Sequence, residues 1–203
     1  MLLSRRPTSS ESSPSEMNIK NNLLARVEAL MDGRLVVWSP QESRSLYAHN
    51  YYGKPLGIAK PKEDFNAPLI LDPIEGIYLL ERMMICVYRG DGENEVGLDE
   101  LIKSASGMLD GFKERYQVYK VLRDKGFIVT PGIKYGCDFA VYEKGPGIDH
   151  APYMIKVKRE EECLTAAEIV EAGRLATSVR KTFIIARVDA SVVRFLSFKW
   201  WRP

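Results

Sequence analysis

The sequence predicts an α/β (α+β) protein, in which a small mixed α/β N-terminal domain precedes a C-terminal domain with a mixed β-sheet flanked by helices. Three observations support this fold class. The spacing of apolar residues changes repeatedly between the helical period of 3.6 and the strand period of two. Gly107 and Gly111 mark a break near the middle of the chain. After this break the predicted order is helix, three strands, helix and two strands, which is typical of a sheet covered by helices. We therefore expect a disordered extension over residues 1–16, an N-terminal domain over residues 17–110 and a C-terminal domain over residues 111–203.

The N-terminal domain is expected to contain short elements of both kinds. Residues 19–34, IKNNLLARVEALMDGR, carry apolar residues at helical spacing and end near Gly33, so we expect a helix there. RLVVWSP predicts a strand, whereas RSLYAHNYYGKPLGIAKPKEDFNAPLILD contains too many Pro and Gly residues to form a single element. PIEGIYLLERMM predicts a helix with Pro73 in its first turn, ICVYRG a strand and NEVGLDELIKSASGML a further helix.

The C-terminal domain begins with FKERYQVYKVLRDKGF, whose apolar stripe predicts a helix with Gly126 just after its end. The period then becomes two, and FIVTPGIKYGCDFAVYEKG predicts a hairpin with Pro131 and Gly132 at the turn. APYMIKVKRE predicts a third strand, and TAAEIVEAGRLATSVRK a helix with Thr165 as its N-cap. TFIIARVDA and SVVRFLSFKWW complete the sheet as two further strands.

The composition excludes several classes of protein. The 203 residues are 45% hydrophobic and 28% charged with a formal net charge of +2, so the chain has a globular core and no overall charge that announces nucleic-acid binding. The three cysteines form no CxxC pair, and we expect reduced, buried thiols and no structural metal site. No apolar run approaches the roughly 18–20 residues that span a bilayer, and the N-terminus lacks the apolar core of a signal peptide. We therefore expect a cytoplasmic protein with no membrane partner.

Three residues are candidates for phosphate chemistry. His150 follows GPGID in a loop, and histidine titrates near neutral pH, which suits proton transfer; the alternative is an ordinary surface histidine. Tyr142 ends a predicted strand, on the face opposite Phe139 and Val141, where its hydroxyl group could simply meet water. Lys181 lies between a helix and a strand, where its ammonium group can stabilise a phosphorane or merely complement the helix dipole. Together they offer a base, an acid and an electrostatic stabiliser.

Metal-dependent and nucleotide-binding chemistry is less well supported. Asp138, Glu143 and Lys144 lack the D…ExK alternation that would aim all three side chains at one metal ion in a PD-(D/E)xK nuclease. No GxxxxGK[ST] loop for nucleotide phosphates is present.

Other cationic and aromatic residues offer contacts to RNA. Arg174 lies on a predicted helix, and Trp200 and Trp201 lie near the end of the sequence; an arginine plane or an indole can stack an unpaired base. The tryptophans could instead anchor the last strand. Lys60 lies on a predicted loop and suits a phosphate contact, or is simply solvated.

The segments YKVLRDKGFIVTPGIKYGCDFAVYEKGPGIDHAPYMIKV and SVRKTFIIARVD closely resemble the tRNA-splicing (tRNA-intron) endonucleases of archaea. The resemblance runs from about Phe112 to Val188, with a weaker match through HNYYGKP and PIEGIYLLERM. It implies a restriction-endonuclease-like nuclease domain that cleaves precursor tRNA at bulge–helix–bulge intron–exon junctions. The implied reaction uses no metal or other cofactor: the ribose 2′-OH attacks the adjacent phosphate, which leaves a 2′,3′-cyclic phosphate and a 5′-OH.

The resemblance also implies residue roles. Tyr142, His150 and Lys181 match the family's catalytic triad. Tyr142 would accept the 2′-OH proton, which requires a lowered pKa or a concerted step; His150 would protonate the departing 5′ oxygen, and Lys181 would stabilise the transition state. Arg174 matches the cationic side chain that holds a bulged base, and Trp201 is the best match for the aromatic one, with Trp200 as a competitor.

Two departures from the simpler homotetrameric members bear on assembly. The segment LGIAKPKEDFNAP, which includes Lys60, resembles the extra loop of crenarchaeal catalytic subunits, and VDASVV is shorter and less acidic than the loop with which some members dock subunits. Both favour a catalytic subunit that pairs with a separate structural subunit in an α2β2 heterotetramer, with the last strand offering an edge for pairing. The alternative is a non-catalytic structural subunit of the same assembly.

Overall fold

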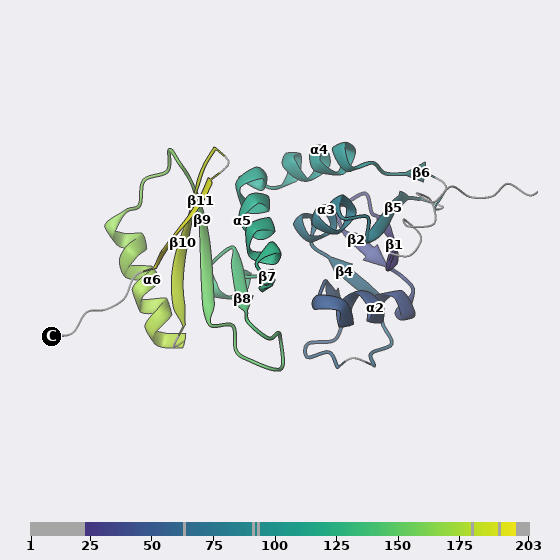
Figure 1. Cartoon of the computed structure of the whole chain (residues 1–203), viewed down its shortest axis with the longest axis horizontal. Coiled ribbons are helices and arrows are strands. Elements are labelled where there is room, and N and C mark those ends of the chain that lie inside the picture. Colours follow the sequence, from purple (N-terminus) through teal and green to yellow (C-terminus); the bar gives the residue numbers. More distant parts are fainter. Residues whose placement is uncertain are drawn as a thin grey trace, which may run out of the picture.

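The computed structural model in Figure 1 describes residues 23–62, 64–90, 92, 94–179, 181–190 and 192–197. The expected extension over residues 1–16 lies outside the described residues, as do Trp200 and Trp201. Across the part of the chain that is described, no helix has both the length and the apolar character needed to cross a membrane.

The N-terminal half forms a six-stranded mixed sheet with helices packed around it (Figure 1). The strand order is β3-β4-β2-β1-β5-β6, in which β1 and β5 run parallel and the other neighbours antiparallel. The elements are β1 (Ala25–Ala29), β2 (Leu35–Val37), α2 (Pro40–Asn50), β3 (Lys54–Pro55), β4 (Leu69–Leu71), α3 (Pro73–Glu81), β5 (Ile85–Arg89), β6 (Asn94–Glu95) and α4 (Leu98–Met108).

The helix expected over residues 19–34 was wrong, because residues 25–29 form strand β1. Ala25, Val27 and Ala29 are buried on one face of this strand, and it pairs in parallel with β5. The short run LLARVEAL satisfies both the helical and the strand period, and pairing with β5 in the interior of the sheet decides between them.

Helix α2 was not predicted: Pro40 belongs to the segment expected as a strand, and residues from Arg44 onward belong to the interrupted Tyr-, Pro- and Gly-rich stretch. The sequence nevertheless contains its start signals: Ser39 is the N-cap and its Oγ accepts a hydrogen bond from the backbone N–H of Glu42 at 3.3 Å, and Pro40 occupies the first turn. The helix ends at Tyr51, which adopts a left-handed backbone with φ of 55°. Helices α3, with Pro73 in its first turn, and α4 agree with the prediction, as do strands β2 and β5.

The C-terminal half forms the expected mixed sheet, with strand order β11-β10-β9-β8-β7. Strands β9 and β10 are parallel and the other neighbours antiparallel. The elements are α5 (Phe112–Asp124), β7 (Ile128–Pro131), a short 3₁₀ helix η1 (Ile133–Tyr135), β8 (Phe139–Tyr142), β9 (Tyr153–Arg159), α6 (Ala166–Val179), β10 (Thr182–Asp189) and β11 (Val192–Ser197).

Two local predictions in this half have different outcomes. The N-cap of α6 is confirmed, since Thr165 Oγ1 accepts from the N–H of Glu168 at 3.2 Å while the Glu168 carboxylate accepts from the N–H of Thr165 at 3.0 Å. The hairpin between β7 and β8 is present, but its connection is longer than a turn at Pro131 and Gly132, because η1 is inserted there.

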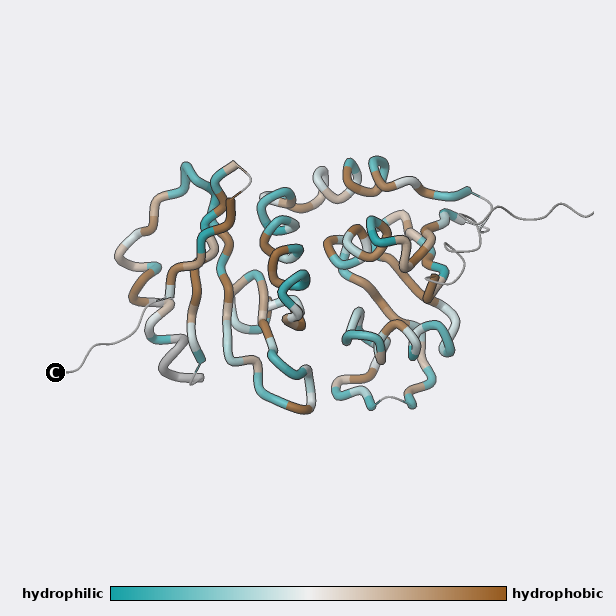
Figure 2. The backbone as a smooth tube through the Cα atoms, in the orientation of Figure 1, coloured by the Kyte–Doolittle hydropathy of each residue, from teal (hydrophilic) through white to brown (hydrophobic). Residues whose placement is uncertain are grey.

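Helix α5 lies between the two halves (Figure 1), and its buried face joins one continuous core with residues of both. Figure 2 shows hydrophobic segments along α5 and the central strands and hydrophilic segments in many loops. Gly111, with φ of 66°, is the N-cap of α5. The division of the chain between residues 110 and 111 stays a prediction.

The expectation of buried cysteines holds for only part of the set. Cys137 is buried and Cys86 is partly buried, whereas Cys163 is exposed. Cys163 lies in the connection between β9 and α6, which runs over the surface and gives its side chain no core to enter.

Candidate active site

Three strand ends meet at one end of the C-terminal sheet. Tyr142 is the last residue of β8, Tyr153 begins β9 and Thr182 begins β10. Val141 pairs with Tyr153, and Tyr153 pairs with Thr182, so these strand ends lie in one row. The register therefore brings Tyr142 and the residue before Thr182, Lys181, to the same edge of the sheet, as the candidate chemistry requires.

The loop from Glu143 to Asp149 closes on itself at this edge. The Asp149 carboxylate accepts hydrogen bonds from the backbone N–H groups of Glu143, Lys144 and Gly145, at 3.3, 3.1 and 2.9 Å. The N–H of Ile148 also donates to the carbonyl of Gly145 at 3.1 Å. Burial favours the neutral carboxyl group, but the three backbone donors outweigh it and hold the pKa of Asp149 below its ordinary value. The loop thus has a defined shape.

Lys181 connects this loop to the start of β10. Its half-buried ammonium group donates a hydrogen bond to the carbonyl oxygen of Ala151, and lies 5.6 Å from the centroid of the Tyr135 ring. His150 is exposed and lies between Asp149, which closes the loop, and Ala151, which Lys181 holds. The chain thus brings His150 next to the residue that Lys181 contacts.

Tyr142 is half-buried and lines a cavity of about 390 Å³ between the two halves of the chain. Burial raises the pKa of Tyr142, and the neighbouring Tyr135 phenol raises it further, whereas a hydrogen bond with Thr130 opposes both. The lowered pKa that one version of the catalytic role requires is therefore not found in the protein without RNA.

Both halves of the chain contribute to this cavity. Tyr47, Tyr51 and Lys54 come from α2 and the segment after it, and Tyr135 and Lys134 from the β7–β8 connection. Lys54 and Lys134 are exposed, so ammonium groups stand beside the tyrosine rings of the cavity, whose lining also includes Pro and aliphatic residues and the carboxylates of Asp72 and Glu75. Such a combination suits a polyanion with unpaired bases.

The competing acidic constellation does not converge. Asp138 precedes β8 and is partly buried; it pairs with Arg115 at 3.1 Å and accepts a hydrogen bond from the N–H of Val157 at 2.8 Å. Glu143 follows β8 and accepts from the Tyr153 hydroxyl group at 2.9 Å. The whole strand separates the two carboxylates. Within the described ranges, no group of three or more His, Cys, Asp or Glu side chains could hold a metal ion.

The expected RNA-contact residues lie on other segments of the chain or outside the described residues. Arg174 is exposed on α6, as predicted. Lys60 is exposed on the connection between β3 and β4, and its neighbours Ala59 and Pro61 line the cavity. Trp200 and Trp201 belong to the part of the chain that is not described.

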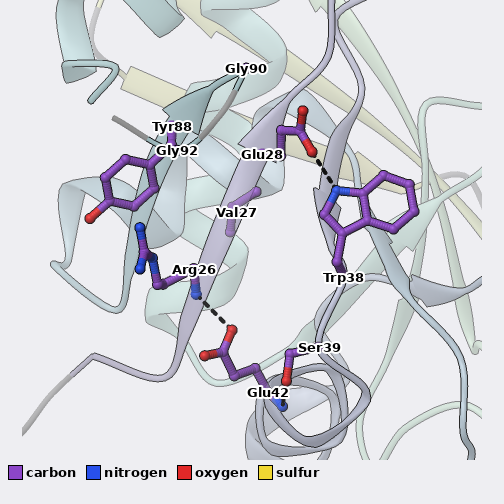
Figure 3. A pocket seen from close by; sticks show the side chains of 9 residues that line it. All are labelled: Arg26, Val27, Glu28, Trp38, Ser39, Glu42, Tyr88, Gly90 and Gly92. Atoms are coloured by element: carbon purple, nitrogen blue, oxygen red, sulfur yellow. Dashed lines mark hydrogen bonds between the residues drawn. The ribbon is translucent and has the colours of Figure 1, made fainter. Parts of the chain in front are cut away.

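A second cavity, of about 350 Å³, lies on the N-terminal half and contains none of the candidate residues (Figure 3). The exposed indole of Trp38 donates to the carboxylate of Glu28, and the guanidinium group of Arg26 lies 4.5 Å from the Tyr88 ring centroid. The side chains in Figure 3 are therefore already engaged with one another.

Three residues of the candidate site were not expected from the sequence: Tyr51, Tyr135 and Asp149. For Asp149 only a general signal was present, because Asp is a common turn residue whose side chain bonds nearby backbone groups. For Tyr51 and Tyr135 no local signal exists, since both reach the cavity through the packing of distant elements.

Comparisons with known proteins give one consistent result. The family model described as "tRNA intron endonuclease, N-terminal domain" matches residues 27–102, and "tRNA intron endonuclease, catalytic C-terminal domain" matches residues 112–195. The chain is 47% identical over 177 residues to the tRNA-splicing endonuclease of Hyperthermus butylicus. The alignment covers 86% of this chain and 97% of that protein. It is 41% identical over 179 residues to the tRNA-splicing endonucleases of Saccharolobus islandicus and Saccharolobus solfataricus, covering 86% of this chain and 98% of each relative.

Proposed function

Because the chain belongs to the tRNA intron endonuclease family and is a tRNA-splicing endoribonuclease, we propose that it cleaves precursor tRNA at bulge–helix–bulge junctions without a metal ion. The products are a 2′,3′-cyclic phosphate and a 5′-OH. The observation that carries the proposal is the Lys181 bond to Ala151, which joins the loop bearing His150 to the sheet edge where Tyr142 ends β8. The proposed place of action is the cytoplasm.

In the proposed reaction the 2′ oxygen bonds to phosphorus while the bond from phosphorus to the 5′ oxygen breaks. Tyr142 takes the 2′-OH proton, and His150, in its protonated form, gives a proton to the 5′ oxygen. Lys181 stabilises the negative charge of the pentacoordinate phosphorus. In-line attack needs a splayed nucleotide, which a bulge permits and an A-form helix resists.

The raised pKa of Tyr142 constrains its step. Because burial and Tyr135 favour the neutral phenol, a preformed tyrosinate is scarce in the protein without RNA. We therefore place Tyr142 in a concerted transfer, in which the phenol releases its own proton to solvent as it takes the proton of the 2′-OH. The partial exposure of Tyr142 supports this route.

Contacts to RNA and to a second subunit belong to the same proposal. Arg174, exposed on α6, and Trp201 or Trp200 hold a bulged base, and Lys60 contacts the phosphate backbone. A separate structural subunit completes an α2β2 heterotetramer. The support for this assembly is the long β3–β4 connection and the short β10–β11 connection.

The test is cleavage of a bulge–helix–bulge RNA in excess EDTA, with and without a candidate structural subunit. We expect cut RNA with a 2′,3′-cyclic phosphate end, and loss of cleavage in His150→Ala. The chain has two histidines, and His49→Ala, which changes the exposed histidine of α2, is the matched control. Light scattering of the same mixtures measures the mass of the assembly.

Three results would contradict the proposal. Absence of cleavage with every subunit combination excludes a catalytic chain and favours a structural subunit. Cleavage that requires Mg²⁺ excludes the metal-independent reaction. A light-scattering mass that stays that of a homotetramer in the presence of the second subunit excludes the heterotetramer.

A further inference from the structure

The N-terminal half of the chain contacts the loop that precedes His150. Gly145 is buried in this loop and has a φ of +128°, and a Cβ atom at this position would lie 2.5 Å from Cε2 of Tyr51. The loop backbone therefore packs directly against the Tyr51 ring, with no room for a side chain between them. Figure 1 shows the loop between β8 and β9 extending toward the N-terminal half.

The loop is a compact body that transmits this contact. Asp149 joins the N–H groups of three residues, including Gly145, and the residues on either side of the loop belong to β8 and β9. A displacement of Gly145 therefore displaces Asp149 and the next residue, His150. The Tyr51 ring limits where this body can lie.

Tyr51 is itself held by the N-terminal half. Its backbone N–H donates to the carbonyl of Tyr47 at 2.7 Å, and the two rings meet edge to face with centroids 5.3 Å apart. On either side of Tyr51, the carbonyl of Asn50 accepts from Arg123 at 2.9 Å and the N–H of Gly53 donates to Glu75 at 2.9 Å.

Arg123 and Glu75 form a buried ion pair between α5 and α3, with nitrogen and oxygen 3.2 Å apart. The segment that carries Tyr51 is thus fixed to this pair at both ends. A continuous series of contacts therefore supports the loop: the Arg123–Glu75 pair holds residues 50–53, and the Tyr51 ring contacts Gly145.

We propose that Tyr51 is a positioning residue: its ring holds the loop so that His150 lies beside the departing 5′ oxygen. This inference rests on the proposed role of His150 as proton donor. Tyr51 touches neither reacting atom in this proposal and acts through the loop alone. A displacement of about 1 Å costs up to roughly 100-fold in rate, so loss of the ring reduces kcat by about 10- to 100-fold. Because Tyr51 also lines the cavity, KM for RNA can change as well, but the change in KM is smaller than the loss in kcat.

The test compares Tyr51→Ala, Tyr51→Leu and Tyr51→Phe in the full chain in its cleaving assembly. Tyr51→Phe keeps the ring and retains activity within about two-fold of wild type, whereas Tyr51→Ala lowers kcat by the expected factor. Tyr51→Leu retains much of the volume and folds even where the Ala variant does not, and it also lowers kcat. Tyr88→Ala, which removes a partly buried tyrosine ring on β5 beside the second cavity, is the matched control and retains kcat.

A substrate whose scissile 5′ oxygen is replaced by sulfur separates positioning from loss of structure. A thiolate departs without a proton, so His150→Ala recovers most of its rate on this RNA. The cleavage rates of Tyr51→Ala and Tyr51→Leu recover to the same extent on this RNA if the defect of these variants lies in the position of His150. Because Tyr51 acts only through His150 in this proposal, the combined Tyr51→Leu/His150→Ala variant cleaves no more slowly than His150→Ala alone.

The outcomes separate the two proposals. If His150→Ala is as active as wild type on normal RNA, or does not recover on the sulfur substrate, the role of His150 as proton donor is wrong. If His150→Ala recovers but the Tyr51 variants do not, or if Tyr51→Leu has wild-type kcat, the positioning role of Tyr51 is wrong while the proposed function stands.

Discussion

Arg123→Met tests how firmly the two halves of the chain are joined. Arg123 has no exposed side-chain surface and donates to the carboxylate of Glu75, the carbonyls of Asn50 and Val129 and the hydroxyl group of Tyr119. Methionine keeps much of the volume and removes the charge and every donor. The variant therefore leaves the Glu75 carboxylate, which is 9% exposed, without its cation.

Removal of one partner of a buried ion pair costs about 3–5 kcal/mol in the free energy of unfolding. The carbonyls of Asn50 and Val129 also lose a donor, so we expect a loss at the upper end of that range. A domain is typically stable by about 5–15 kcal/mol, and the variant therefore loses a large part of the total. The double variant Arg123→Met/Glu75→Gln removes both charges, and we expect it to be more stable than the sum of the single changes by about 2 kcal/mol.

The pH dependence adds a second signature. Burial raises the pKa of Glu75 to about 7, although Arg123 and the N–H of Gly53 favour the ionised form. The pKa of Glu75 is thus higher in the folded than in the unfolded state. The stability that the neutral Glu75 carboxyl group contributes is therefore present below about pH 4.5 and is lost as the pH rises through 7. Without Arg123 the pKa of Glu75 rises further. The loss in the free energy of unfolding caused by Arg123→Met therefore grows between pH 6 and pH 8.

The measurement is urea unfolding followed by far-UV circular dichroism at both pH values. Urea is preferred because guanidinium is a salt and screens the charges that are tested. The reasoning is refuted if Arg123→Met costs less than about 1 kcal/mol at pH 8, if the double variant is additive, or if the cost is larger at pH 6 than at pH 8.

Four further changes have defined outcomes. Tyr142→Phe should abolish cleavage while RNA affinity measured by filter binding is unchanged; residual cleavage near wild type would exclude the phenol as proton acceptor. Arg174→Ala should slow cleavage at least about 5-fold, the loss of one stacked base, without changing the thermal unfolding midpoint, and an unchanged rate would exclude the base contact. Asp149→Ala should slow cleavage more than it lowers stability, because the loop loses three backbone hydrogen bonds; since the pKa of Asp149 is lowered, that support is present at neutral pH and lost as the pH falls through its folded value. Thr165→Ala should cost about 1 kcal/mol through loss of the α6 N-cap, with Thr165→Ser as the control that keeps it, and equal stability of the two variants would contradict the cap.

Local chemistry explains which elements could be predicted. The N-cap at Thr165, the Pro at the start of α3 and the alternating strands β7 to β11 depend on neighbours in sequence, and each was predicted correctly. Helix α2 was not predicted although Ser39, Pro40 and Glu42 are helix start signals, because the Tyr-, Pro- and Gly-rich residues that follow them are typical of a loop. Strand β1 could not be decided locally, since its short run fits both periods until β5 pairs with it.

The candidate site divides in the same way. Residue types suggested Tyr142, His150 and Lys181 as candidates, and the resemblance to the tRNA-splicing endonucleases gave each an expected role. Their meeting at one sheet edge depends on the register of β8, β9 and β10, which the alternating pattern restricts but does not set. Which face of β8 carries Tyr142 was predictable; that its surroundings raise its pKa was not.

The sequence by itself determined the candidate reactive groups, the order of helices and strands in the C-terminal half, and the Gly-Pro-Gly segment before His150. Only the tertiary structure decided that Gly145 rests on Tyr51 and that Glu75 meets Arg123, 48 residues further along the chain. The physical reason is that helix caps and strand alternation arise from forces between near neighbours. The contacts that place a loop beside the candidate site arise only when distant segments bury their surfaces against each other.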